Sequence, residues 1–170
     1  MEGWYLEDFE VGTTYRSAAR TVTEADVVNF AGLSGDFNPL HMDEEYAKTE
    51  SMFGKRIAHG MLGAVWMTGM SNQMGMFAGT TIAFLELTIR YVAPLEIGAT
   101  VHLEFTPTEV RHSSKPGRGV LFLDANLVDQ DGKTITECKW NLMMKARSLK
   151  NKNRIASAAR VSGRRCLFPP

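Results

Sequence analysis

The chain has little cysteine. Cys138 and Cys166 are the only two among its 170 residues, so no framework of disulfide bonds is available to hold a fold together. A hydrophobic fraction of 44% is instead sufficient for a buried core, and the length is that of one domain, with or without a short extension.

The first residues, MEGWYLEDFE, lack the basic stretch followed by an apolar stretch that marks a leader peptide. The final Phe-Pro-Pro is not a peroxisomal address either. We therefore expect a cytoplasmic protein.

Acidic residues are missing after Glu137, while eight lysines and arginines stand from Lys145 onward. Such a tail could contact nucleic acid, anionic lipid or its own acidic domain. Residues 148–165 have neither aromatic residues for base stacking nor a sustained apolar stripe for membranes. We interpret residues 1–146 as one domain and residues 147–170 as a basic, flexible C-terminal tail, and we do not expect nucleic acid as a partner.

Charge is also absent from residues 57–85, which contain no Asp, Glu, Lys or Arg. A membrane span needs about 20 predominantly apolar residues, and here histidine, glycine, serine and amide residues interrupt the run. We therefore expect no membrane span and predict a buried helix from about Gly60 to Met76. Its methionines are interpreted as core filler: Met61, Met67, Met70 and Met74.

Segments rich in β-branched and aromatic residues dominate the second half of the chain. Asp131-Gly132 is a strong hairpin signal between the last two. Earlier, Thr23 is typical of a helix N-cap and Asp43 of the start of a short helix. This order predicts an α+β domain, an antiparallel sheet wrapped around a long central helix. The expected strands are 13–22, 80–92, 100–111, 119–129 and 133–146.

The segment Phe37-Asn38-Pro39 separates an aspartate, Asp36, from a histidine, His41. Five positions along a helix correspond to about 140° of rotation, so the two could not share a helical face. Proline disfavours the α conformation for its predecessor, so a bend is predicted that lets both side chains point into one cavity. A carboxylate and an imidazole there can move protons at neutral pH. Taken alone, however, Asp-x4-His is more often a helix cap.

The full string resembles the signature of the MaoC-like, (R)-specific enoyl-CoA hydratases, the hydratase-2 family. The matching residues are Phe30, Ser34-Gly35, Asp36-Phe37-Asn38-Pro39-Leu40-His41 and Ala47. Residues 87–98 also resemble a family strand that closes on Pro-x-x-x-Gly-Asp, with Ala99 in place of the usual Asp. The resemblance covers about residues 5–146 and implies a single hot-dog fold, with Asp36 and His41 as catalytic residues.

Residues 56–62, Arg-Ile-Ala-His-Gly-Met-Leu, match the family segment that enters the central helix. A helix start offers free backbone N–H groups for a developing oxyanion, and the resemblance implies that Gly60 is the donor. The alternative, that Gly60 only allows tight packing, is compatible with this role. The resemblance also implies a supporting hydroxyl at Thr68. Asn38 is interpreted as holding the bend, and Ser34 as a further supporting residue.

His59 is interpreted as a structural residue rather than a second acid–base group. A metal site built from Asp36, His41 and His59 is conceivable but is not expected, because the spacing is irregular and no fourth ligand is implied. We therefore expect no metal and no cofactor, with CoA as part of the substrate.

The resemblance thus implies a hydro-lyase that catalyses reversible syn hydration of trans-2-enoyl-CoA to (R)-3-hydroxyacyl-CoA. A homodimer or dimer-based oligomer is expected, because a hot-dog sheet leaves one broad face to bury. The alternatives are a dehydratase of a branched or dicarboxylic hydroxyacyl-CoA or of 3-hydroxyacyl-carrier protein, a hot-dog thioesterase, and a non-catalytic acyl-CoA binder. Chain length, carrier and the assignment of acid and base within the pair stay open.

Overall fold

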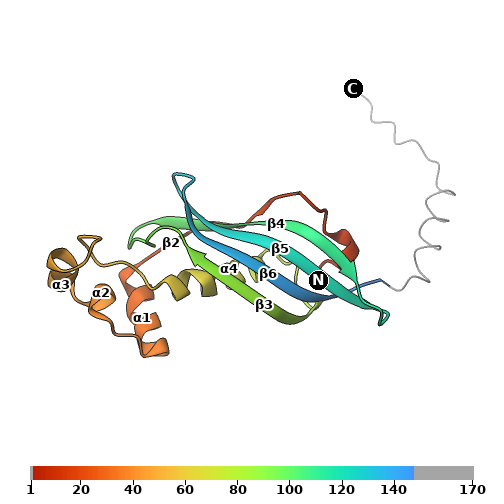
Figure 1. Ribbon diagram of the computed structural model, residues 1–170, viewed down its shortest axis with the longest axis horizontal. Helices are drawn as coiled ribbons and strands as arrows, with labels where there is room; N and C mark the ends of the chain where they lie inside the picture. Colours follow the sequence, from red (N-terminus) through yellow and green to blue (C-terminus); the bar gives the residue numbers. More distant parts are fainter. Residues whose placement is uncertain (1, 148–170) are drawn as a thin grey trace, which may run out of the picture.

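The structure, a computed structural model, describes residues 2–147. An antiparallel sheet curves around the helix α4 (Gly60–Gln73), as Figure 1 shows. Its long strands lie in the order β4-β5-β6-β3. They are β3 (Thr81–Tyr91), β4 (Thr100–His112), β5 (Arg118–Asp129) and β6 (Thr134–Lys145).

The prediction of one continuous strand over residues 13–22 is wrong. The segment forms two short pieces, β1 (Tyr15–Arg16) and β2 (Arg20–Thr21), and both pair with β4. Between them, Ser17 exchanges hydrogen bonds with Leu103, from its N–H to the Leu103 carbonyl and from the Leu103 N–H to its Oγ. The segment therefore stays on the sheet edge while its ladder is interrupted.

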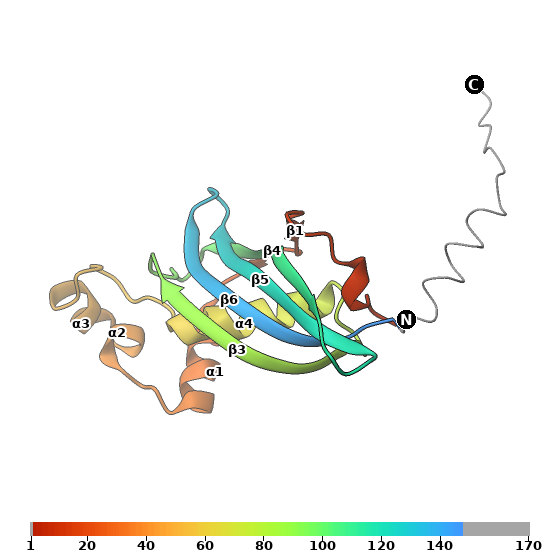
Figure 2. The ribbon, with the colours of Figure 1, turned by 45° about the vertical axis from the view of Figure 1, so that its right-hand side comes forward.

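Three helices gather beyond one end of the sheet, at the left of Figure 2. In α1 (Glu24–Ser34), the Thr23 side chain accepts from the Asp26 N–H, as predicted for an N-cap. The one-turn helix α2 (Pro39–Met42) follows, and then α3 (Glu44–Thr49), whose first turn is capped by Asp43. These helices precede α4 and the long strands in the chain. A short 3-10 helix, η1 (Leu6–Asp8), lies near the N-terminus.

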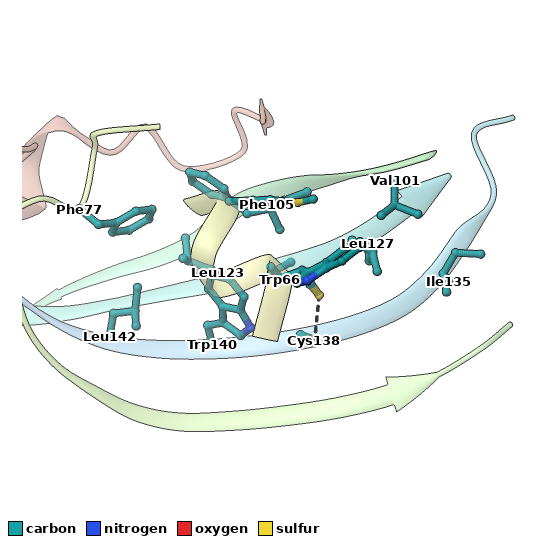
Figure 3. Packing of buried hydrophobic residues seen from close by; sticks show 14 of the residues in the cluster. Trp66, Phe77, Val101, Phe105, Leu123, Leu127, Ile135, Cys138, Trp140 and Leu142 are labelled. Atoms are coloured by element: carbon teal, nitrogen blue, oxygen red, sulfur yellow. Dashed lines mark hydrogen bonds between the residues drawn. The ribbon is translucent and has the colours of Figure 1, made fainter. Parts of the chain in front are cut away.

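The core lies between α4 and the concave face of the sheet (Figure 3). Alternate residues of β5 point inward, so Leu121, Leu123 and Leu127 are buried against the helix layer. Gly63 permits a close approach of helix and sheet, because a Cβ there would lie 2.9 Å from Cδ2 of Leu127. Full burial of each leucine side chain contributes about 1.5–3 kcal/mol to stability.

The prediction that the central helix is buried on all sides is wrong for one face. Met67 and Met70 belong to the core, but Met61 and Val65 are each 48% exposed, and Thr68 is exposed as well. The sheet of one chain covers only one side of α4, which leaves this stripe open. None of the helices in residues 2–147 is long and apolar enough to span a membrane.

The hairpin predicted at Asp131-Gly132 is confirmed, with Gly132 at a φ of 81°. Together with the curved sheet around α4, it completes the hot-dog arrangement.

At the C-terminal end, the Arg147 guanidinium donates to both carboxylate oxygens of Asp8 at 2.6 Å. Arg147 therefore packs on the domain rather than starting the tail. The predictions for residues 148–170 lie outside the described residues.

Candidate active site

The bend that follows α1 is built by local hydrogen bonds. Gly35 ends the helix at a φ of 76°. The Asp36 Oδ1 then accepts from the Asn38 N–H, and the Asn38 Oδ1 accepts from the Leu40 N–H. Asn38 thus holds the bend as predicted. The predicted bend over Phe37-Asn38-Pro39 ends earlier than expected, because Pro39 already begins α2, at a position where its missing N–H is harmless.

Asp36, His41 and Gly60 line one cavity of about 800 Å³. This confirms the prediction that Asp36 and His41 point into one cavity, and the start of α4 faces the same space. Asp36 is exposed at this cavity, whereas His41 is half-buried. Apart from a few polar groups the lining is apolar, with side chains from Phe30, Leu40, Met52, Phe53, Ile57, Met61, Val92, Leu95 and Ile135.

The tautomer of His41 follows from its partner. Its Nδ1 lies 2.8 Å from the carbonyl oxygen of Ile57, which can only accept, so Nδ1 carries the proton. The neutral ring then has a free lone pair on Nε2. Burial lowers the pKa of His41, and the neighbouring His59 lowers it as well, while the Ile57 hydrogen bond and Asp36 oppose the shift. His41 is therefore neutral at pH 7.

Side-chain ligand atoms of Asp36, His41 and His59 lie within 4.8 Å of one another. One water can join two acceptors at this spacing, because two hydrogen bonds of about 2.8 Å span up to roughly 5.6 Å. The same side chains are the donors that a metal ion would have to use. Each imidazole has one nitrogen engaged by a carbonyl. The three side chains are one ligand fewer than a structural zinc site uses and equal the number of protein ligands in a catalytic zinc site.

Gly60 is the first residue of α4, so its N–H lies ahead of the helix's own hydrogen-bond ladder and is open to a ligand. A Cβ on Gly60 would lie 2.7 Å from Cε1 of Tyr91. Glycine is therefore needed for packing at this position, and the role of its N–H as an oxyanion donor stays a prediction. Tyr91, which lines the cavity, belongs to the matched residues 87–98, but no role was predicted for it because it lies 31 positions from Gly60 in the chain.

Ser34 supports the backbone of Asp36. Its hydroxyl donates to the carbonyl of Phe30 at 2.7 Å and accepts from the Asp36 N–H at 3.2 Å. The side chain also lines the cavity. Its supporting role in the reaction stays a prediction.

The fold of one chain does not bring Thr68 to this group. The Thr68 hydroxyl donates to the Val65 carbonyl at 2.7 Å and faces a separate cavity beside Ser71 and Trp140. Eight residues separate it from Gly60, which corresponds to a rise of about 12 Å along a helix. The motif match therefore placed a hydroxyl on α4 without placing it near Asp36 and His41.

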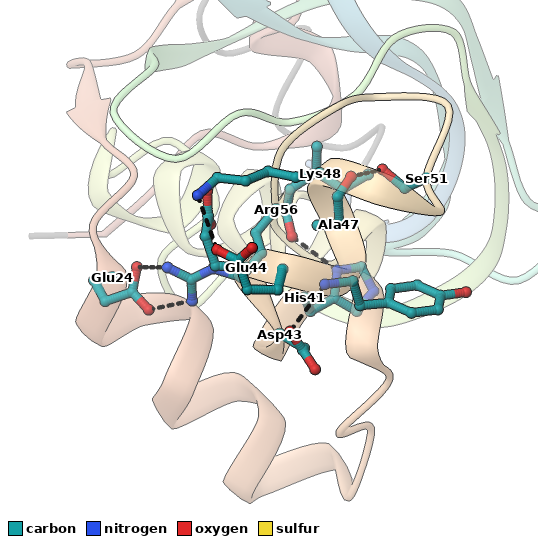
Figure 4. A network of polar contacts seen from close by, with 11 residues as sticks. Glu24, His41, Asp43, Glu44, Ala47, Lys48, Ser51 and Arg56 are labelled. Atoms are coloured by element: carbon teal, nitrogen blue, oxygen red, sulfur yellow. Dashed lines mark hydrogen bonds and ion pairs between the residues drawn. The ribbon is translucent and has the colours of Figure 1, made fainter.

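Arg56 joins the segments that carry the site (Figure 4). Its guanidinium donates to both carboxylate oxygens of Glu24, at 2.6 and 3.0 Å, and to Glu44 at 2.9 Å. These carboxylates raise the pKa of Arg56 and keep it charged. The contacts tie α1 and α3 to the segment that enters α4. Sequence reasoning included Arg56 in the matched segment without a role, because its partners lie 32 and 12 positions away.

His59 precedes α4 and is 2% exposed. Its Nε2 lies 2.8 Å from the carbonyl oxygen of Asp36, and its ring centroid is 3.9 Å from that of His41. The residue is buried, as a structural histidine would be, yet its partners are the residues of the candidate site.

Comparisons with known proteins agree with this arrangement. A family model described as MaoC like domain matches residues 8–121. The (R)-specific enoyl-CoA hydratase of Rhodospirillum rubrum is 38% identical over 104 residues, 61% of this chain and 69% of that protein. The 3-hydroxybutyryl-CoA dehydratase of Methylorubrum extorquens is 33% identical, over 62% of this chain and 65% of that protein. The solved structure of the (R)-hydratase from A. caviae is 29% identical and superposes with a TM-score of 0.68, over 83% and 99% of the two chains.

Proposed function

Because the chain belongs to the MaoC-like domain family, we propose that it is a hydro-lyase that adds water across trans-2-enoyl-CoA to form (R)-3-hydroxyacyl-CoA. The observation that carries the proposal is the placement of Asp36, His41 and the start of α4 at Gly60 around one largely apolar cavity. The same groups serve the reverse reaction, dehydration. Dehydration is the second candidate function, because the Methylorubrum relative is named a 3-hydroxybutyryl-CoA dehydratase.

Asp36 and His41, the dyad, hold the attacking water. The carboxylate form of Asp36 has only acceptor oxygens, and neutral His41 offers the Nε2 lone pair. Both are acceptors, so one water can donate to each and present its oxygen to the β-carbon of the enoyl group. Proton transfer by positioned groups of this kind contributes about 10²–10⁴-fold to a rate.

Gly60 polarises the thioester. Its N–H, at the positive end of the α4 dipole, is a donor for the carbonyl oxygen, which gains negative charge as water attacks. The water oxygen bonds to the β-carbon, and one dyad residue takes a water proton. A proton is then delivered to the α-carbon on the same face, so that H and OH are added overall. No metal or redox cofactor enters this scheme, and CoA is part of the substrate.

The apolar lining suits the acyl chain. Ligand pockets of about 300–1,000 Å³ with a few placed polar groups are usual for small molecules and cofactors, and this cavity falls in that range. Acyl-chain length and branching, and the choice between CoA and a carrier protein, are questions for substrate screening.

A second copy of this chain is the proposed partner for the uncovered face. Most of β3, at the edge of the sheet, is exposed, with Phe84, Leu85 and Leu87 each at least 39% exposed. Met61 and Val65 are exposed on α4. Apolar surface of this kind is typical of an interface. Sedimentation equilibrium should therefore give a dimer or a multiple of it, and Leu87→Asp should shift the distribution toward monomer.

The decisive experiment is hydration of crotonyl-CoA, followed by loss of enoyl absorbance and by the chirality of the product. The expected product is (R)-3-hydroxybutyryl-CoA. Release of free CoA, measured with a thiol reagent, would indicate a thioesterase instead, and binding without turnover would indicate an acyl-CoA binder. A cytoplasmic location is part of the proposal and can be checked by fractionating cells that express the protein.

A further inference from the structure

Two segments of the site exchange histidine–carbonyl hydrogen bonds. His41, from the bend, donates through Nδ1 to the carbonyl of Ile57 at 2.8 Å. His59, from the segment that enters α4, lies with Nε2 2.8 Å from the carbonyl of Asp36. Each segment thus contributes one imidazole and one backbone carbonyl. The pairing fixes the distance between the residues of the bend and the start of α4.

The His59 bond also determines its tautomer. A carbonyl oxygen only accepts, so the proton must be on Nε2 and the neutral ring has none on Nδ1. The Nδ1 atom is buried and has no hydrogen-bond partner among residues 2–147. Leaving a buried polar atom unpaired costs free energy. The ring is therefore not held in place by saturating its polar groups, as a purely structural histidine would be.

The usual reason for a polar residue before a helix does not apply to His59. It occupies the N-cap position of α4, but its side chain makes no capping hydrogen bond. The ring instead lies against His41, with centroids 3.9 Å apart and planes inclined by 33°, and its centroid also lies 5.1 Å from that of Phe30. The side chain is thus directed at the dyad rather than at its own helix.

We propose that His59 is a positioning residue that couples the dyad to the oxyanion donor. It holds the backbone of Asp36 through Nε2–H, limits the tilt of the His41 ring by packing against it, and is joined covalently to Gly60. One side chain thereby relates the water-binding groups to the amide that polarises the thioester. This inference rests on the proposed hydration reaction, in which both groups act on one conjugated enoyl unit.

A graded set of substitutions at His59 tests the role. In Gln the amide nitrogen reaches about as far as Nε2 and can donate to the Asp36 carbonyl, whereas Asn is too short and Leu has no donor. Displacing a reacting group by about 1 Å can cost 10²-fold. His59→Leu and His59→Asn should therefore lower kcat for crotonyl-CoA hydration by about 10²-fold, with little change in KM. His59→Gln should recover most of that loss.

A second comparison separates positioning from stabilisation of the fold. If His59 acts through Asp36, His59→Leu in an Asp36→Asn background should add little to the loss from Asp36→Asn alone. Thermal unfolding midpoints of the Gln and Asn variants should be similar, while their kcat values differ. Equal kcat in both, full wild-type kcat in the Leu variant, or independent losses in the double variant would overturn the proposal.

NMR of the wild-type protein keeps this test distinct from the test of the reaction. Nitrogen-15 spectra of the imidazoles should show His59 protonated on Nε2 alone, with a proton that exchanges slowly. A ring protonated on Nδ1 alone would overturn the positioning role even in an active enzyme. If the wild type hydrated no enoyl-CoA, the proposed function would fail, and with it the catalytic part of this inference, even if the hydrogen bond were observed.

Discussion

The long strands and the helical layer before α4 are held together in different ways. Residues 81–145 form continuous antiparallel ladders over a buried apolar face. Residues 24–60, which carry the candidate site, are joined by side-chain contacts, such as Arg56 with Glu24 and Glu44. Stability is therefore spread over many residues of the strands, while the geometry of the site depends on a few. Single substitutions should therefore affect either stability or activity, depending on the region in which they lie.

The largest expected effect on activity is at the dyad. Asp36→Asn and His41→Ala should each lower crotonyl-CoA hydration by about 10²–10⁴-fold, because each removes a group that transfers protons. Both residues lie outside the buried core, so circular dichroism and the unfolding midpoint should change little. The double variant should cost little more than the worse single variant. Losses below tenfold in both single variants would contradict the assignment.

In the sheet, substitutions should lower stability and leave activity nearly unchanged. Leu123 is 1% exposed within the core under α4, and Leu123→Ala should lower the free energy of unfolding by about 2–5 kcal/mol. At a temperature where the variant stays folded, its kcat should remain close to wild type. Urea denaturation and hydration kinetics on the same sample measure both quantities. A large fall in kcat with unchanged stability would remove the distinction between the two regions.

Arg56 should give an intermediate effect. Arg56→Met removes the contacts that join α1 and α3 to the segment entering α4, and should lower kcat by roughly tenfold through loss of positioning. Arg56→Lys keeps the charge but not the bidentate contact with Glu24, so it should restore only part of the activity. The matched control is Lys55→Met, which removes the exposed Lys55–Glu96 ion pair and should have almost no effect. Equal losses at both positions would argue against a specific role for Arg56.

The pH dependence should follow His41. Its pKa is lowered mainly by burial, so its charge state in the folded protein changes below the ordinary value of about 6.5. The acid limb of kcat/KM should therefore fall at a pH below that value. Since the depressed pKa means that the folded state binds fewer protons, the associated stability is present above about 6.5 and lost as pH falls through the folded pKa. NMR titration of the His41 ring, with urea-unfolded protein as control, measures the shift, and a midpoint above the unfolded value would contradict it.

The smallest effect is expected from removing residues 148–170, which should leave crotonyl-CoA hydration largely unchanged, because the matched domain ends before them. If truncation raised KM strongly at low salt and weakly at high salt, the basic tail would be a contact for the CoA phosphates.

Local stereochemistry made much of the site predictable. Asn38-Pro39 favours a break in the helix at Asn38, because proline restricts both itself and its predecessor. That rule, with the motif around it, was enough to direct Asp36 and His41 into one cavity. The same kind of rule identified the Thr23 cap and the Asp131-Gly132 hairpin. It failed for the strand over residues 13–22, where pairing with β4 rather than strand propensity decides which residues join the ladder.

By itself, therefore, the sequence determined the α+β order of elements, the bend at Pro39 and the free N–H at the start of α4, because each depends on neighbours within a few positions. Only the tertiary structure decided which carbonyl sets each histidine tautomer, that Arg56 joins α1 to α3, and that Thr68 lies away from the dyad. Those features depend on contacts between distant segments. Such contacts form when the sheet closes around α4, so they cannot be predicted from the type and spacing of neighbouring residues.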